Sequence, residues 1–146
     1  MILYAGIFII FLSSLAASNN PPQKASSPLQ CLTLNIYHEA RGEGVEGMWA
    51  VGEVTLNRVK DNRWPSSICS VVYQDKQFSW THDKIADEMH EEDGKKLSES
   101  VARLVIAGLN LNLTQGGTHY HADYVTPSWS SSLIKTTTIN NHIFYK

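Results

Sequence analysis

The sequence carries little net charge, few cysteines and no internal repeat. Its 146 residues have a formal net charge of −2, which argues against a nucleic-acid partner, because such proteins present a basic surface. The two cysteines lack Cys-x-x-Cys spacing and therefore do not form a zinc site by themselves. What is present is an apolar fraction of 42%, close to the average of soluble globular proteins, in a length that suits one domain.

The longest apolar run, residues 2–12, lies at the N-terminus and is shorter than the roughly 20 residues that span a membrane. Small residues follow it, as in a signal-peptidase site, although no Lys or Arg precedes it. We expect residues 1–18 to be a signal peptide or an N-terminal anchor and residues 19–27 to be a polar linker. The protein is then exported to the periplasm, cell envelope or exterior, with membrane contact only through an uncleaved N-terminal segment.

Cys31 and Cys69 lie in the expected folded domain, residues 28–146. An exported protein meets an oxidising compartment, where an even number of cysteines allows a disulfide. Such a bridge would stabilise the fold by about 3 to 4 kcal/mol in the chain-entropy model. Two buried free thiols are the alternative, and the sequence leaves both open.

The first helix is predicted to begin after Ser27, which can act as N-cap, with Pro28 in the first turn and Gln30 completing a capping box. An apolar stripe runs along it to about Arg41, and Gly42 is placed to end it. The stripe comprises Leu29, Leu32, Ile36 and Ala40.

Helical periodicity recurs in three further segments, at 45–62, 66–74 and 82–111. The last is predicted to break at Gly94, and residues 75–80 are predicted to form a loop. From residue 118 the sequence alternates and is rich in aromatic residues, which predicts a strand at 118–125. Two β runs follow within 133–146, joined by a tight turn at Asn140-Asn141. The predicted helices come first in the chain and a small antiparallel sheet comes last. This order indicates an α+β fold.

Glu39 lies at the edge of the apolar stripe of the first predicted helix. At about 100° per residue it is roughly 60° from Ile36, so its carboxyl points partly toward the interior. Desolvation disfavours the anion and raises the pKa of such a carboxyl, as a general acid requires at neutral pH. Glu39 is therefore the candidate catalytic residue.

Five segments, in this order, resemble the SleB-like cell wall hydrolases of the spore-cortex lytic enzyme family: YHEARGEG, AVGEVTLNRV, WPSSICSVVYQDKQFSW, GGTHYHADYVTPSW and HIFY. The resemblance, from about Leu32 to Tyr145, implies a lysozyme-like α+β domain with N-terminal helices packed against a small C-terminal antiparallel sheet. It also implies cleavage of peptidoglycan glycan strands between N-acetylmuramic acid and N-acetylglucosamine. Lytic transglycosylation, forming 1,6-anhydromuramic ends without a cofactor or metal, is the implied reaction. The family's catalytic glutamate, which precedes Ala-Arg-Gly-Glu, corresponds to Glu39, and we expect a monomer.

Three other acids require an interpretation. Glu43 follows Gly42. It either has a substrate-binding or electrostatic role, or it holds backbone N–H groups or pairs with Arg41. Glu53, inside the second predicted helix, is interpreted as a satisfied polar neighbour of the site rather than a catalytic group. Glu46 is expected to be solvated.

The segment THYHADY offers His119, Tyr120 and His121 as substrate-binding residues. On a strand the two histidines share one face and Tyr120 takes the other. Core packing and a metal site, suggested by the His-x-His spacing, are the alternatives, and the resemblance favours sugar contacts. Tyr120 is expected beside Glu39, where it stabilises charge as the bond breaks. Trp129 is open between sugar contact and core packing.

The segment QFSW contributes Phe78 and Ser79 as further candidates for binding the glycan. Core packing is the alternative for Phe78 and Trp80, and the sequence does not decide between the two. Asn57 and Arg58 are interpreted as structural residues that tie the second helix to loops.

Rival functions remain open at this point. One is a hydrolytic muramidase, in which water is the nucleophile. Another is a metal-dependent cell-wall amidase or peptidase built on His38, His119 and His121. A non-catalytic peptidoglycan-binding module is disfavoured, because it needs no acid at an apolar helix edge. Whether the protein is a bacterial remodelling enzyme or a phage endolysin also stays open.

Overall fold

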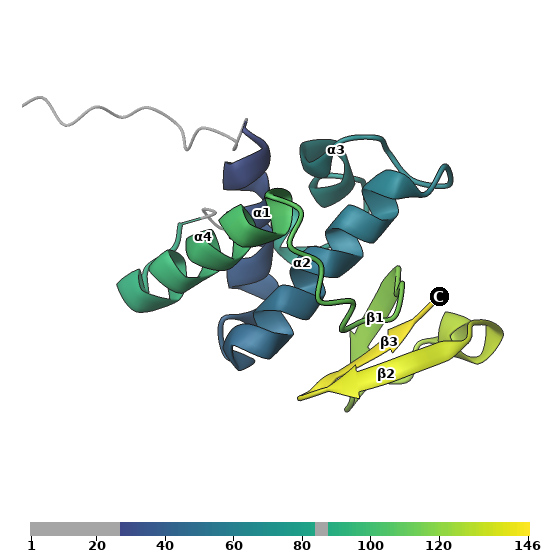
Figure 1. The fold of residues 1–146 in the computed structure, drawn as a ribbon. Coiled ribbons are helices and arrows are strands. Elements are labelled where there is room, and N and C mark those ends of the chain that lie inside the picture. Colours follow the sequence, from purple (N-terminus) through teal and green to yellow (C-terminus); the bar gives the residue numbers. More distant parts are fainter. Residues whose placement is uncertain (1–26, 84–87) are drawn as a thin grey trace, which may run out of the picture.

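The computed structural model describes residues 27–83 and 88–146. Within these ranges it contains four α-helices and a three-stranded antiparallel sheet, with the helices first in the chain and the sheet last (Figure 1). The predicted signal or anchor at 1–18 and the linker up to residue 26 lie outside the described residues. No helix in the described ranges has the length and apolar character that crossing a membrane requires.

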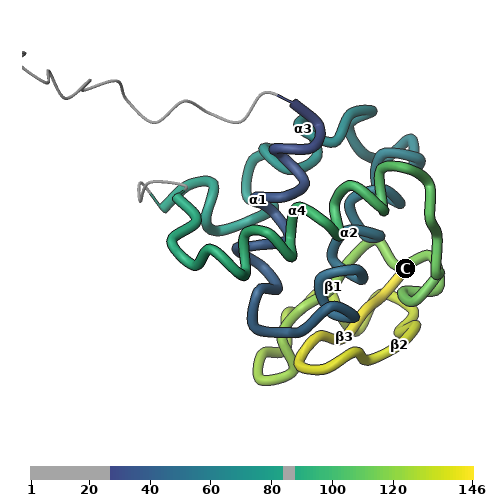
Figure 2. Tube along the Cα trace, turned by 60° about the vertical axis from the view of Figure 1, so that its left-hand side comes forward, coloured from purple at the N-terminus to yellow at the C-terminus, as the bar shows by residue number. Residues whose placement is uncertain are grey.

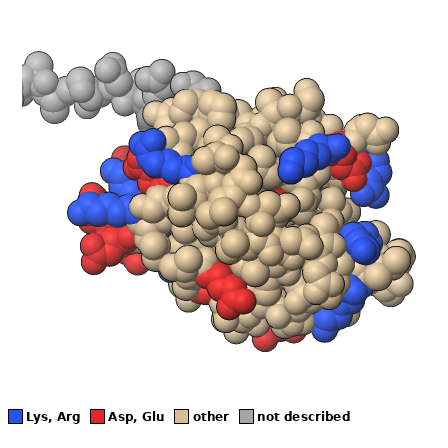
Figure 3. All heavy atoms as spheres, in the orientation of Figure 1, with Lys and Arg blue, Asp and Glu red and all other residues tan. Residues whose placement is uncertain are grey.

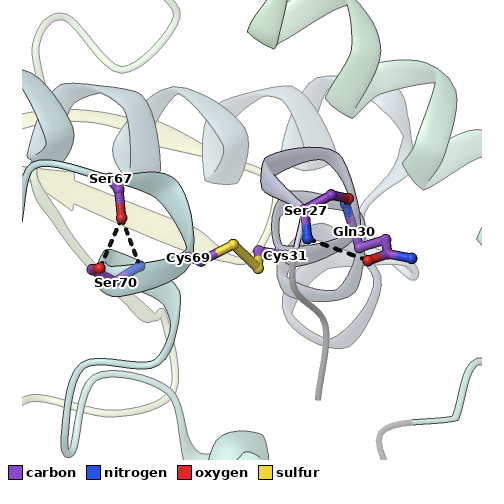
Figure 4. Close-up of a disulfide and its surroundings, with 6 residues drawn as sticks. All are labelled: Ser27, Gln30, Cys31, Ser67, Cys69 and Ser70. Carbon is purple, nitrogen blue, oxygen red and sulfur yellow. Dashed lines mark hydrogen bonds between the residues drawn. A yellow bond between two sulfur atoms is a disulfide. The ribbon is translucent and has the colours of Figure 1, made fainter. Parts of the chain in front are cut away.

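The first helix, α1 (Pro28–Ala40), begins with the predicted capping box. The Ser27 hydroxyl accepts a hydrogen bond from the Gln30 N–H over 3.1 Å, and the Gln30 side chain accepts one from the Ser27 N–H over 3.3 Å (Figure 4). These bonds satisfy N–H groups that have no partner within the helix. The sequence signal for the helix start is therefore confirmed.

A short turn joins α1 to α2 (Gly44–Lys60). The helix ends before Gly42, as predicted, and Arg41 closes it with helical backbone angles. The residue that redirects the chain is Gly44, whose φ is 67°. Since glycine adopts this left-handed angle without steric cost, Gly44 sets the direction in which α2 begins.

The third helix, α3 (Ile68–Val72), is capped by Ser67, whose hydroxyl accepts a hydrogen bond from the Ser70 N–H over 3.2 Å. Cys69 on α3 is joined to Cys31 on α1 by a disulfide, with the two Cα atoms 5.3 Å apart (Figure 4). The cysteines are 38 residues apart in the chain, and a loop of that length is worth about 4 kcal/mol in the chain-entropy model. The bridge therefore fastens α1 to α3.

The fourth helix, α4 (Glu92–Ile106), is shorter than the helix predicted at 82–111, whose described residues before 92 are not helical. Glu91 is extended, and its N–H donates a hydrogen bond to the Tyr37 hydroxyl over 3.0 Å. The predicted break at Gly94 is also wrong, because Gly94 lies in the first turn of α4. A Cβ at this position would come within 3.3 Å of the Tyr37 ring, so packing rather than helix breaking explains the glycine.

The C-terminal part forms a sheet of three strands: β1 (His119–Ala122), β2 (Lys135–Ile139) and β3 (His142–Tyr145). The spatial order is β1–β3–β2, and both pairs are antiparallel. The predicted hairpin between β2 and β3 is confirmed, with Asn140 at a φ of 49° in its turn. The pairing of β1 with β3 sets Tyr120 opposite Phe144.

The core lies among the helices and between them and the sheet, which lies below the helices and next to α2 in both ribbon and tube views (Figures 1 and 2). One cluster joins α1, α2 and α4, a second surrounds the disulfide, and a third joins α2 to the sheet. The Tyr120 side chain packs against all three clusters. Charged groups of both signs are intermixed toward the rim of the face in Figure 3, notably over the start of α4.

Candidate active site

Glu39 is the last residue but one of α1, and its carboxyl faces the sheet. The Tyr120 hydroxyl donates a hydrogen bond to Oε2 of Glu39 over 2.8 Å. Ile36 and Ala40, the neighbours of Glu39 on the apolar stripe, are fully buried, whereas Glu39 itself is half-buried. The predicted position at an apolar helix edge therefore brings a carboxyl into partial contact with solvent.

Burial is the main influence on the Glu39 carboxyl and raises its pKa above the ordinary value of a glutamate. The hydrogen bond from Tyr120 and the charge of Arg58 act in the opposite direction and only partly offset this effect. The structure thus favours a proton on Glu39 while providing two groups that stabilise its anion. This combination suits a residue that first donates a proton and later takes one back.

Tyr120 lies on β1 and reaches Glu39 from the face of the sheet that packs on the helices. Its ring contacts the rings of Phe144 and His142, with centroids 5.6 and 5.1 Å away. Burial raises the pKa of the Tyr120 phenol well above its ordinary value, and the neighbouring Glu39 raises it further. Tyr120 therefore stays protonated and acts as a hydrogen-bond donor.

Glu43 lies four residues after Glu39, but its carboxylate contacts Asn141 rather than Tyr120. Its carboxylate accepts hydrogen bonds from the N–H and the side-chain amide of Asn141, each over 3.0 Å, and its carbonyl accepts one from Asn140 over 2.6 Å. Arg41 pairs instead with Glu91 at 3.0 Å. Both oxygens of Glu43 are thus engaged by the β2–β3 turn, which supports the structural alternative stated above.

Partial burial alone would raise the pKa of Glu43, but the two hydrogen bonds from Asn141 and the nearby His142 together lower it. Glu43 is therefore an anion at neutral pH. Glu46 is exposed, as expected. Glu53 is 5% exposed, and its two oxygens accept hydrogen bonds from the Leu113 and Thr114 N–H groups over 3.2 and 3.0 Å, which confirms its interpretation as a satisfied polar group.

The histidines of β1 point away from Glu39. His121 is buried, and its ring nitrogens lie 2.8 Å from the Ala122 carbonyl and 2.9 Å from the Tyr145 hydroxyl. His119 is half-buried between the rings of Trp64 and Trp129, with centroids 5.4 and 5.5 Å away. Burial lowers the pKa of His119. The alternation predicted for this strand is correct, and it leaves Tyr120 alone among the three on the face of Glu39.

Trp129 lies in a short 3-10 segment, η2 (Ser128–Ser132), that covers this outer face of the sheet. Its ring also contacts His121 and Tyr145, with centroids 5.6 Å away in both cases. His38, the third histidine of the rival metal site, stacks on Trp80 instead, at 4.7 Å. In the part of the chain that the structure describes, no group of three His, Cys, Asp or Glu side chains has the geometry to hold a metal ion.

Phe78 and Trp80 are 4% and 7% exposed and belong to the core cluster around the disulfide. Their burial favours the core alternative over a direct sugar contact for Phe78. Ser79, between them, is exposed and begins a second 3-10 segment, η1 (Ser79–Thr81), inside the predicted loop. Of these two candidates, Ser79 is therefore open to solvent and Phe78 is not.

Asn57 and Arg58 do tie α2 to loops, as the sequence indicated. The Asn57 amide donates a hydrogen bond to the Gly117 carbonyl over 2.9 Å, and Arg58 Nε donates one to the Thr118 carbonyl over 2.7 Å. The sequence reasoning missed the second property of Arg58, which is that its charge acts on Glu39. Its spacing of seven residues from the buried Val51 was the available signal, because that spacing places an arginine on the inner face of the helix.

Two solved structures are similar to this fold. The catalytic domain of the germination-specific lytic transglycosylase SleB from Bacillus anthracis has a TM-score of 0.71 and 25% identity, covering 87% of this chain and 100% of that one. The catalytic domain of the Bacillus cereus SleB protein has a TM-score of 0.66 and 26% identity, covering 90% and 98%. This likeness confirms the predicted α+β architecture, with N-terminal helices packed against a small C-terminal antiparallel sheet.

The chain is also similar to curated spore cortex-lytic enzymes. That of Halalkalibacterium halodurans is 29% identical over 130 residues, which are 88% of this chain and 37% of the relative. That of Bacillus cereus is 27% identical over 142 residues, which are 90% and 52%. The chain thus spans about half the length of these relatives or less. A family model described as Cell Wall Hydrolase matches residues 42–145, and the chain belongs to this family, as the five segments predicted.

Proposed function

We propose that this chain cleaves peptidoglycan glycan strands between N-acetylmuramic acid and N-acetylglucosamine, as a lytic transglycosylase with Glu39 as its catalytic acid and base. The observation that carries the proposal is the half-buried Glu39 carboxyl, with its raised pKa and its hydrogen bond from Tyr120. It is supported by the likeness to a catalytic domain that is itself named a lytic transglycosylase.

In the proposed reaction, protonated Glu39 donates its proton to the glycosidic oxygen, and the bond from that oxygen to C1 of the muramic acid breaks. The C6 hydroxyl of the same sugar attacks C1, and the Glu39 carboxylate takes the proton of that hydroxyl. The products are a free hydroxyl on the released sugar and a 1,6-anhydro ring. Glu39 ends protonated, and no water is consumed.

The state of the neighbouring acid favours this reaction over hydrolysis. A glycosidase that uses water ordinarily needs a second carboxylate as base or nucleophile. Glu43 follows Glu39 in the chain, but both its oxygens accept hydrogen bonds from Asn141. A mechanism that needs one carboxyl group therefore agrees better with the residues that surround Glu39. The substrate class implies that the protein acts at the cell envelope or outside the cell.

Mass spectrometry of the muropeptides released from purified sacculi tests the proposal. The wild-type chain is expected to release fragments that are lighter by one water and lack a reducing end, and Glu39→Gln is expected to release them on the order of a thousandfold more slowly. Fragments with a reducing end would favour a hydrolytic muramidase. Activity that a chelator abolishes, with cleavage of the peptide rather than the glycan, would favour a metal-dependent amidase. Unchanged glycan cleavage by Glu39→Gln would overturn the catalytic assignment.

A further inference from the structure

Arg58 is a buried cation held by aromatic rings and a carbonyl group. It is 5% exposed, and its Nε donates a hydrogen bond of 2.7 Å to the carbonyl of Thr118, the residue before β1. Its guanidinium carbon lies 4.1 Å from the centroid of the Trp64 ring and 5.6 Å from that of Phe78. These contacts fix the charge at the junction between α2 and the start of β1.

No carboxylate forms a salt bridge with Arg58 within residues 27–83 and 88–146. Its Nη1 is buried and has no hydrogen-bond partner in those ranges. Burying a cation without a directly bound anion is energetically unfavourable, so this arrangement calls for a compensating role. Burial lowers the pKa of Arg58 to about 10, which leaves it charged at neutral pH.

We propose that Arg58 is a positioning residue of the site: it holds β1 so that Tyr120 meets Glu39, and its charge stabilises the Glu39 carboxylate once the proton has left. The inference rests on the proposed role of Glu39 as acid. While Glu39 is protonated, the guanidinium faces a neutral group. When the proton moves to the glycosidic oxygen, an anion forms in its field, so the stabilisation belongs to the transition state rather than to the resting enzyme.

The other titratable groups around this pair do not supply the same effect. Tyr120, on β1, is neutral and donates a hydrogen bond. His119, also on β1, has its pKa lowered by burial and by the guanidinium, so it is neutral at pH 7. Asp61 and Arg63, in the turn after α2, act on His119 with opposite signs and are bound to each other at 2.6 Å. Among the residues that the structure describes, Arg58 is thus the cation whose charge lowers the pKa of Glu39.

The test is the pH dependence of kcat on purified sacculi for Arg58→Gln and Arg58→Lys. A general acid must be protonated, so activity falls as pH rises through the pKa of Glu39. Removing the charge raises that pKa, so Arg58→Gln is expected to move the alkaline limb to higher pH and to lower the plateau kcat on the order of tenfold, with KM unchanged. Arg58→Lys keeps the charge and is expected to keep the limb in place. Arg103→Gln, which removes an exposed arginine paired with Glu99 on α4, is the matched control.

An alkaline limb of Arg58→Gln that coincides with that of the wild type would overturn the inference, as would a rise in KM alone. If the Gln variant does not fold, Arg58→Met fills the same space with an apolar chain and is expected to give the same displaced limb. If neither variant folds, the alkaline limb of the kcat profile of Arg58→Lys decides. A limb displaced from that of the wild type contradicts the role of charge, and a limb at the same pH supports it. Failure of the proposed function is distinct: it would appear as an active Glu39→Gln variant, whatever the Arg58 variants do.

Discussion

The chain carries two carboxylates on either side of one glycine turn, and their surroundings give them opposite properties. Glu39 lies in the last turn of α1 and faces the sheet. Burial raises its pKa there, and the Tyr120 hydroxyl donates a hydrogen bond to it. Glu43 precedes α2, where two hydrogen bonds from Asn141 help to lower its pKa and hold the β2–β3 turn. Proximity along the chain therefore says little about function here. What separates the two acids is the balance between burial and hydrogen bonding: burial prevails at Glu39 and favours its proton, whereas the hydrogen bonds outweigh burial at Glu43 and favour its charge.

Removing each carboxylate in turn tests this contrast most directly. Glu39→Gln keeps the shape and a hydrogen-bond acceptor for Tyr120 but cannot donate or accept the catalytic proton. We expect its rate of glycan release from sacculi to fall on the order of a thousandfold. Its thermal unfolding serves as the control, because a variant that folds like the wild type has lost chemistry rather than structure. A loss smaller than that of Glu43→Gln would reverse the assignment of the two acids.

Tyr120→Phe removes the hydroxyl that binds Glu39 and leaves the ring in the core. We expect kcat to fall by roughly ten- to a hundredfold, because the carboxylate formed during the reaction loses a donor. Since that hydrogen bond lowers the pKa of Glu39, its loss is also expected to move the alkaline limb of the pH profile upward. Tyr124→Phe, at a side chain that is 84% exposed in the turn after β1, is the matched control. Equal turnover in the two variants would contradict a role for Tyr120.

Glu43→Gln tests the structural side of the comparison. At pH 7 we expect it to lower the free energy of unfolding by about 1 kcal/mol, through weaker hydrogen bonds to Asn141, and to change kcat by only a few fold. Because the folded state lowers the pKa of Glu43, its contribution is present above the ordinary glutamate pKa and is lost as pH falls through the folded pKa. The difference in stability from the wild type should therefore vanish in acid.

The exposed Glu46 gives the control for that measurement, since Glu46→Gln should change neither stability nor activity. A loss of kcat in Glu43→Gln as large as that in Glu39→Gln, with unchanged stability, would instead assign Glu43 to the substrate.

The smallest expected effect is on the stability of Glu39→Gln itself. The folded state raises the pKa of Glu39, so it binds this proton more tightly than the unfolded chain does. The corresponding stability is present below the ordinary glutamate pKa and is lost as pH rises through the raised one. Glutamine does not titrate, so the variant is expected to unfold at a slightly higher temperature than the wild type near pH 8. Calorimetry across pH should show opposite slopes for the two acids, and parallel slopes would contradict their contrast.

Local signals in the sequence predicted the parts of the site that local geometry controls. The capping box at Ser27, the stripe through Ile36 and the alternation around Tyr120 each depend on neighbours within a few residues, and each is confirmed in the structure. These three features suffice to orient Glu39 and Tyr120 within their elements, although their contact across 81 positions of the chain is visible only in the fold.

One helix boundary is wrong because distant contacts override local preference, and local patterns leave the roles of Phe78 and Arg58 undecided. Residues before Glu92 have a helical composition, but Glu91 is held extended by the Tyr37 hydroxyl and pairs with Arg41. Phe78 lies in a segment without periodicity, so no pattern distinguished a core position from an exposed one. The effect of Arg58 on Glu39 is electrostatic and acts through space, so the spacing from Val51 indicates that Arg58 faces inward but not which carboxyl it acts on.

The order of the sheet has a consequence for when the site comes into being. Among the described residues, β1 pairs with β3 alone, and β3 lies between β1 and β2 and follows both in the chain. Tyr120 therefore gains its place opposite Phe144 only after β3 has been made, and pairings between segments that are distant in the chain form slowly. During synthesis Glu39 leaves the ribosome long before its phenol partner is in place. A chain still being made thus holds this carboxyl without the hydrogen bond from Tyr120.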